Sequence, residues 1–340
     1  MTLNDEQLRG LVNAAQLYET WRDAKAQLAQ LPGGMYWRVI HSKEYLYQYL
    51  KGPAGQQTKS LGPRTPKTEE EHHEFEETKK ALDERCAGVE ARIEEYAPMW
   101  RALHLPAIDR SAGRILRALD QSDFVGKSVM VIGTYALKAY EVASASDFST
   151  GMDATDDLDF TLCLGAENID PDVPRRLLLT LRQADKSFIV TTNSAGTLVN
   201  KDGYKIDLLT NHAAASHYSS SLPWKPIALE GQEWLLLGTP VDTVAIDLTG
   251  WPVRIVAPDP RYFALHKLWL SKRPGRPAAK RAKDGRQGNA LLGAIQLHMS
   301  QYPFDAAFVA GLPPALRNEL PQDVLAPAPA IDSAIDIPPP

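Results

Sequence analysis

The segment Asp156-Asp157-Leu158-Asp159-Phe160-Thr161-Leu162 alternates acidic and apolar residues, which is typical of a half-buried β-strand. Side chains of a strand point alternately to its two faces, so Asp157 and Asp159 share one face while Leu158 and Phe160 face the core. The two carboxylates then lie about 7 Å apart at their Cα atoms and repel each other at neutral pH. A divalent cation between them removes that repulsion, and hard oxygen ligands suit Mg²⁺. The segment therefore predicts a metal site on a strand.

Two further features of the sequence fit a site that binds a metal ion and a phosphate. Asp207 interrupts the apolar run Lys205–Leu209, so a third carboxylate is expected on a neighbouring strand, and three such acids make a site for one or two ions. Gly133-Thr134 follows the apolar strand Val129–Ile132 and precedes an expected helix at 135–142. A turn at a helix N-terminus favours a phosphate, because backbone N–H groups and the helix dipole point at it. Gly133 allows a close approach, and the Thr134 hydroxyl adds a donor.

In this order the residues resemble a known family. Gly133-Thr134, the pair Asp157/Asp159, and Asp207 match the G[GS]…[DE]h[DE]…h[DE]h signature of the DNA polymerase β-like nucleotidyltransferases, with Thr134 where Ser is usual. The signature covers about residues 125 to 210, and a wider resemblance to a bacterial nucleotidyltransferase-domain family extends to about Gly288. The resemblance implies a core of mixed sheet with flanking helices. It also implies transfer of a nucleoside monophosphate from an NTP such as ATP, with release of pyrophosphate.

The resemblance also implies roles for the acids. Asp157 and Asp159 would hold the ion that carries the triphosphate and also contact a second ion, whose ligand shell Asp207 completes. Mg²⁺ is the expected cofactor, with two ions, and Mn²⁺ is the alternative. Asp207 is also a candidate base for the acceptor hydroxyl.

Basic residues that could offset phosphate charge lie downstream. His266 and Lys267 are expected on a helix that opens at Asp259-Pro260, and Lys280, Lys283 and Asp284 at the start of the last helix. This arrangement resembles the Lys-bearing helix and Lys/Asp pair of related nucleotidyltransferase toxins. Lys267, Lys280 and Lys283 are therefore predicted to bind the nucleotide, although the basic run 272–286 equally fits a solvated surface.

The predicted fold class is α+β, with four parts. Residues 1–120 should form a helix from Asn4 to Leu31, a small antiparallel meander, and a charged helix whose capping box begins at Thr68. Residues 121–257 should form the catalytic core, with a further strand from Trp251 to Val256, and 258–320 a helical region whose last helix ends near Met299. The Pro- and Ala-rich stretch 321–340 should be disordered.

Bulk composition narrows the class of protein. The 340 residues are 44% hydrophobic and 23% charged, which is ordinary for a globular chain. A net charge of −5 excludes a polycation that binds nucleic acid over its whole surface, so such binding needs a local basic patch. Two distant cysteines, no secretory leader and no apolar run of membrane-spanning length predict a cytoplasmic protein without a membrane partner.

Several alternatives stay open. Asp156 takes the place of Asp157 if the strand register slips, and the acids could instead be solvated turn or strand-end groups. Tyr45, Tyr47 and Tyr49 alternate on one face of the meander, where packing is favoured over base stacking. The acceptor is expected to be RNA, particularly a tRNA end, with protein or a small molecule as alternatives and a regulatory partner protein allowed. The competing function is an inactive nucleotide- or nucleic-acid-binding regulator, with residues 33–66 as its working part.

Overall fold

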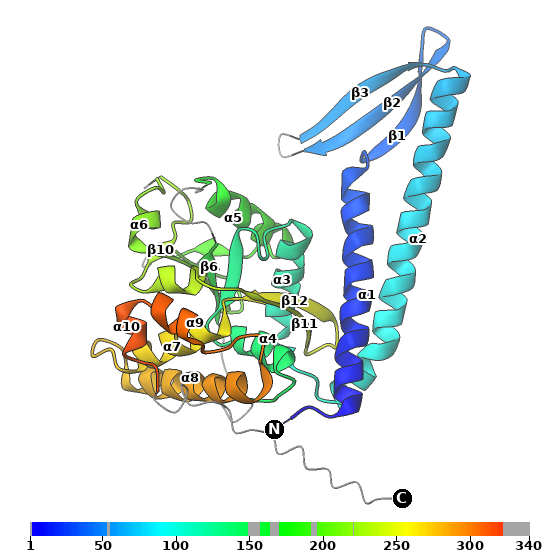
Figure 1. Ribbon diagram of the computed structural model, residues 1–340. Coiled ribbons are helices and arrows are strands. Elements are labelled where there is room, and N and C mark those ends of the chain that lie inside the picture. Colours follow the sequence, from blue (N-terminus) through cyan, green and yellow to red (C-terminus); the bar gives the residue numbers. More distant parts are fainter. Residues whose placement is uncertain are drawn as a thin grey trace, which may run out of the picture.

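The computed structural model of the chain describes residues 2–52, 55–148, 157–163, 170–191, 196–219 and 221–321. A long helical hairpin with a small sheet at its far end stands beside a larger body (Figure 1). The body contains two further sheets, with helices packed around them.

The hairpin consists of α1 (Asp5–Gln30) and α2 (Pro66–Ala102), which lie side by side. The Asn4 side chain accepts a hydrogen bond from the backbone N–H of Gln7, so the predicted first helix is confirmed. The second helix was predicted with the wrong capping box. It is capped by Thr65, with Pro66 in the first turn, and the Thr68 side chain reaches back to the N–H of Thr65.

The meander at the tip is confirmed. Strands β1 (Gly34–Ile40), β2 (Lys43–Gly52) and β3 (Gly55–Pro63) pair antiparallel in the order β1-β2-β3. One face packs on α2, where Leu46 is fully buried and the Trp37 ring lies 5.7 Å from that of His72.

The base of the hairpin is tied to the body by an apolar cluster that includes Tyr18, Trp21, Ile93, Trp100 and Ile246. Each fully buried large side chain of this kind contributes about 1.5–3 kcal/mol to stability. The Tyr18 hydroxyl donates to the Asp120 carboxylate at 2.9 Å. The base is therefore held by packing together with a buried polar contact.

The larger sheet of the body contains β5 (Val129–Ile132), β6 (Asp157–Leu162), β9 (Lys205–Thr210), β8 (Thr197–Val199) and β7 (Ile189–Val190), in that order, with β10 (Ile227–Ala228) beside β9. The pairs β6–β9 and β9–β10 are parallel, and the other pairs are antiparallel. The predicted α+β class with a mixed sheet is confirmed.

A second, smaller sheet in the body was only partly predicted. Strand β12 (Pro252–Ala257) was expected, but its antiparallel partner β11 (Val241–Asp247) and the two-residue strand β4 (Ala107–Ile108) were not. Strand β11 carries acidic residues, which are uncommon in strands. Asp247 is nevertheless fully buried, and it accepts a hydrogen bond from Arg117 at 2.7 Å.

Helices surround both sheets: α3 (Arg110–Gln121), α4 (Ala136–Ala143), α5 (Val173–Ala184), α6 (His212–Ala215), the short 3₁₀ helix η1 (Gln232–Leu236), α7 (Pro260–Ser271) and α8 (Ala278–His298). The prediction that α8 is the last helix was wrong. Two short helices follow, α9 (Ala306–Gly311) and α10 (Pro314–Arg317), and Phe308 and Leu316 pack against α7 in an apolar cluster with Tyr262.

The structure does not test the predicted C-terminal tail or the two predicted domain boundaries. The expected disordered tail lies, from residue 322 onward, outside the described residues, and the boundaries at 120/121 and 257/258 stay predictions. Among the described helices, none has the length and apolar character needed to cross a bilayer.

Candidate active site

The acidic residues of β6 and β9 lie side by side in the larger sheet. Asp159 and Asp207 are direct register partners across the parallel β6–β9 pair, and Asp157 lies opposite Lys205. All three carboxylates belong to half-buried residues, whereas Leu158 and Phe160 between and beside them are buried. The predicted alternation on β6 is confirmed. Because neighbouring strands are about 4.8 Å apart, the backbone itself brings the acids together.

Gly133 occupies a position where no side chain fits. Its φ of +68° is a conformation that L residues rarely adopt, and a Cβ there would lie 2.3 Å from Oδ2 of Asp159. The preceding residue, Ile132, pairs with Asp159 across β5 and β6. The glycine of the sequence signature is thus explained by the close approach of an acidic side chain to the turn.

These residues open into a cleft of about 620 Å³, a size typical of small-molecule sites. Its lining includes the three acids and Gly133, together with residues of β10, η1, α7, the segment 273–277 and the start of α8. Four basic side chains line the same cleft: Lys267, Arg273, Arg276 and Lys280. Thr134 is half-buried in the turn and Lys283 half-buried on α8, and neither lines the cleft.

The environment of the cleft strongly shifts the pKa of Asp159. Burial, together with the negative charges of Asp157 and Asp207, raises the pKa of Asp159 to about 7, while Lys267 and Lys280 act in the opposite direction. The Asp159 carboxyl is therefore partly protonated near neutral pH, because burial and the two neighbouring charges both disfavour its ionised form. A titration so far from normal in a cleft is a recognised sign of a functional site.

Lys267 is the most buried of the basic groups. Its Nζ donates to Oδ1 of Asp284 at 3.0 Å, and Arg276 binds the other oxygen of the same carboxylate. Burial lowers the pKa of Lys267, and the charge of Asp284 opposes that effect. The Lys/Asp pair formed by Lys267 and Asp284 thus joins α7 to α8. From the sequence, the lysines and the aspartate of such a pair were expected together at the start of α8.

His266 was predicted as a basic group, and that prediction was wrong. It is buried beside the rings of Trp234 and Trp269, and burial lowers the pKa of His266 to about 3, so the imidazole is neutral at physiological pH. Trp269 also lines the cleft, with the Arg273 guanidinium 4.5 Å from its ring centroid. No pattern in the sequence distinguished these aromatic residues from ordinary core residues.

Comparison with known protein families accords with this geometry. A model described as Nucleotidyltransferase matches residues 110–310, which is more than half of the chain. The chain belongs to this nucleotidyltransferase family. Searches of curated proteins and of solved structures gave no match. The family match begins at α3, so the hairpin and the meander of this nucleotidyltransferase lie before it.

The nucleotidyltransferase carries a donor set that suits a hard cation, although the acids do not form a ready-made cage. Within the described ranges, no three His, Cys, Asp or Glu side chains are grouped as a metal site. Oδ1 of Asp207 instead accepts a hydrogen bond from the Thr197 hydroxyl on β8 at 2.5 Å. Carboxylate oxygens fit Mg²⁺, and a cation would relieve the repulsion that raises the pKa of Asp159. Asp156, the alternative ligand, lies outside the described residues.

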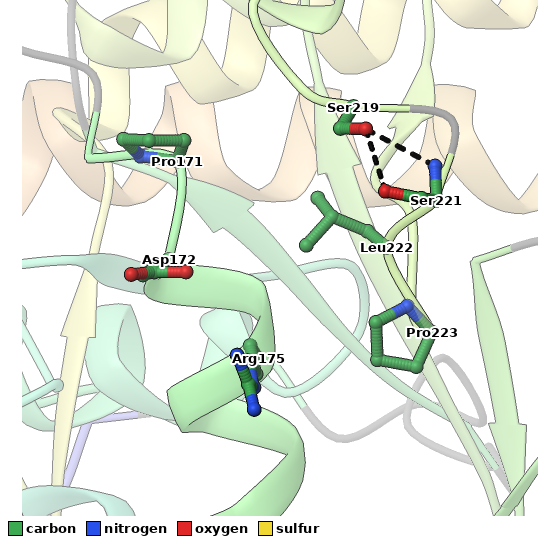
Figure 2. Close-up of a pocket in the computed structure, with 7 residues that line it drawn as sticks. All are labelled: Pro171, Asp172, Arg175, Ser219, Ser221, Leu222 and Pro223. Atoms are coloured by element: carbon green, nitrogen blue, oxygen red, sulfur yellow. Dashed lines mark hydrogen bonds between the residues drawn. The ribbon is translucent and has the colours of Figure 1, made fainter.

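A second hollow of about 440 Å³ lies at the start of α5 (Figure 2). Asp172 and Arg175 are its charged residues, and the hydroxyls of Ser219 and Ser221 are hydrogen-bonded to each other at 2.8 Å. It lacks the three carboxylates and the lysines that line the larger cleft. The candidate active site of the nucleotidyltransferase is therefore the cleft between β6–β9 and α7–α8.

Proposed function

We propose that this nucleotidyltransferase moves a nucleoside monophosphate from an NTP to an acceptor hydroxyl, with Mg²⁺ as cofactor. The observation that carries the proposal is that Asp157, Asp159 and Asp207 line one nucleotide-sized cleft together with Lys267 and Lys280. Two acids alone would suit many kinds of site. Three acids together with lysines suit the transfer of a highly charged phosphate group.

Asp157, Asp159 and Asp207 would hold two ions, with Mn²⁺ as the alternative metal. When bound, Mg²⁺ neutralises phosphate charge and lowers the pKa of a coordinated hydroxyl. A group-transfer enzyme of this class forms a bond from the acceptor oxygen to the α-phosphorus while the α–β phosphoanhydride bond breaks. The acceptor proton passes to a carboxylate, for which Asp207 is our choice, and pyrophosphate leaves.

The other cleft residues have supporting parts in this proposal. Gly133 lets the nucleotide approach the turn after β5, because it has no side chain between the turn and Asp159. Lys267 and Lys280 offset the charge that builds on the leaving pyrophosphate. Thr134 as a phosphate donor and Lys283 as a further cation stay predictions.

For the acceptor we favour RNA, in particular a tRNA end, over protein or a small molecule. The end of an RNA chain that is not base-paired carries ribose hydroxyls that can enter a cleft of this size. Action in the cytoplasm, and control by a partner protein, belong to the same proposal.

The decisive experiment follows labelled phosphate from donor to acceptor. Purified protein is incubated with each α-³²P-labelled NTP, Mg²⁺, and either total tRNA or a protein extract. Label should reach one acceptor class, and Asp157→Ala/Asp159→Ala should abolish the transfer. The matched control is Asp83→Ala/Glu84→Ala, which removes two exposed acids from α2 and should leave transfer unchanged. If no NTP labels any acceptor, the competing regulator function replaces this proposal.

A further inference from the structure

The meander at the tip of the hairpin has two unlike faces. One packs on α2 through Trp37 and Leu46. The other, here named the tyrosine face, follows from the strand register, because cross-strand partners share a face. It carries Tyr36 opposite Tyr47, Arg38 opposite Tyr45, and Tyr49 opposite Gly34, with Lys43 opposite Ile40.

The rings of the tyrosine face are arranged to present flat surfaces. Tyr36 and Tyr47 are stacked, with ring centroids 6.0 Å apart and planes inclined by 23°. A Cβ on Gly34 would lie 2.4 Å from the Tyr49 ring, so the glycine leaves room for that ring to lie across β1. Tyr45, Tyr47 and Tyr49 succeed one another along β2 at intervals of about 7 Å. Tyrosines in this arrangement form a row of π-surfaces on one sheet.

The tyrosine face is open rather than part of a core. Tyr36 is 40% exposed, Arg38 and Lys43 are exposed, and the other three tyrosines are half-buried among their neighbours. The sheet lies at the far end of the hairpin from its base, on the same side of the hairpin as the body (Figure 1). The meander therefore packs against α2 through the opposite face. Among the described residues, the tyrosine face is not buried against another helix or sheet.

The tyrosine face is positively charged, whereas helix α2, on which the meander packs, is negatively charged. Arg38 and Lys43 form no ion pair with any described residue, and the nearby acid Glu44 lies on the other face, bound to Arg64 at 2.8 Å. The Arg38 guanidinium lies 5.9 Å from the Tyr47 ring centroid. By contrast, α2 carries ten Glu and one Asp against six Lys and Arg. An anionic partner is thus attracted to the tip and repelled by the helix beneath it.

We infer that the tyrosine face binds single-stranded RNA, stacking bases on the tyrosines and placing phosphates near Arg38 and Lys43. Aromatic rings with interleaved cations are the usual means of binding single strands without a base code. A second copy of the chain would be a poorer fit, because two such faces would bring the same positive charges together. The choice of RNA over single-stranded DNA rests on the proposed function, in which an RNA end is the acceptor.

The length of the hairpin bears on the inference. The 26 residues of α1 place the tip about 39 Å from the base of the hairpin, so we expect only a long acceptor to reach the tyrosine face and the cleft together. The tyrosine face should therefore increase the affinity for long RNA. It should not alter reaction with an acceptor as short as a dinucleotide.

Binding of a fluorescent, unstructured, mixed-sequence single-stranded RNA to the full-length protein tests the inference. Tyr47→Ala should weaken binding by about fivefold or more, whereas Tyr47→Phe, which keeps the ring, should bind as the unmutated protein does. Arg38→Glu/Lys43→Glu should reduce the dependence of log affinity on log salt by about 1.4, which is two phosphate contacts on a single strand. The matched control is Lys80→Glu/Arg85→Glu, the same charge change on exposed residues of α2.

The outcomes separate this inference from the proposed function. Unchanged binding by Tyr47→Ala, equal affinity for single-stranded DNA, or a dimer that Tyr47→Ala dissociates would each overturn it. RNA binding that survives Asp157→Ala/Asp159→Ala supports it whether or not nucleotide transfer is found. Transfer to long RNA with the same KM in Tyr47→Ala would leave the proposed function standing and reject the role of the tyrosine face.

Discussion

The cleft and the tyrosine face gather opposite charges by the same structural device. On β6 and β9 the pleat places Asp157, Asp159 and Asp207 together, and burial with the two neighbouring charges raises the pKa of Asp159 to about 7. On β1 and β2 it places tyrosines beside Arg38 and Lys43, with no described acid on that face. The first arrangement is electrostatically costly and suits a cation. The second arrangement has little electrostatic cost and suits an anion. We therefore expect single substitutions to alter activity or stability more strongly in the cleft than on the tyrosine face.

Gly133→Ala removes no functional group but should have a large effect on nucleotide transfer. The new Cβ would meet Oδ2 of Asp159 at 2.3 Å, and a φ of +68° strains any L residue. Displacing a reacting group by about 1 Å costs on the order of 100-fold in rate, and nucleotide transfer should fall by that amount. Gly275→Ala is the control, because it lines the same cleft with nothing within 4 Å of the added carbon. Equal losses in both variants would refute the steric explanation.

Lys267→Met and Lys280→Met should separate charge from packing. Both remove a cation from the cleft, so both should reduce transfer. Lys267 is 7% exposed and bonded to Asp284, so its loss leaves a buried carboxylate with Arg276 alone and should lower the unfolding free energy by about 2–4 kcal/mol. Lys280 is exposed, and its loss should change stability by less than about 0.5 kcal/mol. Denaturant melts of the two variants measure this difference in stability. Similar unfolding midpoints would contradict the prediction that only Lys267 is important for stability.

Asp159→Asn should stabilise the metal-free protein, but only at higher pH. The pKa of Asp159 rises from 3.8 to about 7 on folding, so its favourable contribution is complete below pH 3.8 and is lost as pH rises to 7. Above pH 7 the variant should exceed the unmutated protein by about 2 kcal/mol, a value reduced for partial solvent screening. Melts in EDTA between pH 4 and 8 measure the difference. A constant gap across that range would mean that Asp159 is not electrostatically strained.

Thr197→Val should have the smallest effect on nucleotide transfer. It removes the hydroxyl that donates to Asp207 at 2.5 Å, and one such bond to a charged group contributes about 1.5–3 kcal/mol at most. We expect a loss near the lower limit, because Asp207 is only half-buried, with a severalfold change in transfer. Thr58→Val on the exposed β3 strand is the same change in the other region and should leave the unfolding midpoint and the transfer rate unaltered.

Local patterns predicted the parts of the molecule in which neighbouring residues determine the structure. The alternation at Asp157–Phe160 predicted β6, and the single acid within the apolar run at 205–209 led us to expect a neighbouring strand, which is β9. Short elements held by tertiary packing were missed, among them α9, α10 and the two-residue strand β4. Their sequences contain too few residues to show a period.

The far wall of the cleft could not be predicted for a related reason. The contact between Lys267 and Asp284 spans two helices, and Arg276 completes it from the loop between them. His266 was misjudged because its charge state depends on burial beside Trp234 and Trp269, which the sequence does not reveal. Contacts of this kind arise only when distant segments pack together.

The most direct test of the account is equilibrium binding of each labelled NTP to the unmutated protein and to Asp159→Asn, in Mg²⁺ and in EDTA, without any acceptor. The account predicts that at least one NTP binds the unmutated protein in Mg²⁺, and that EDTA or the substitution reduces its affinity by at least tenfold, about 1.4 kcal/mol. Binding that is equally tight in EDTA and in Asp159→Asn would contradict the assignment of the three acids as the centre that holds the metal and its nucleotide.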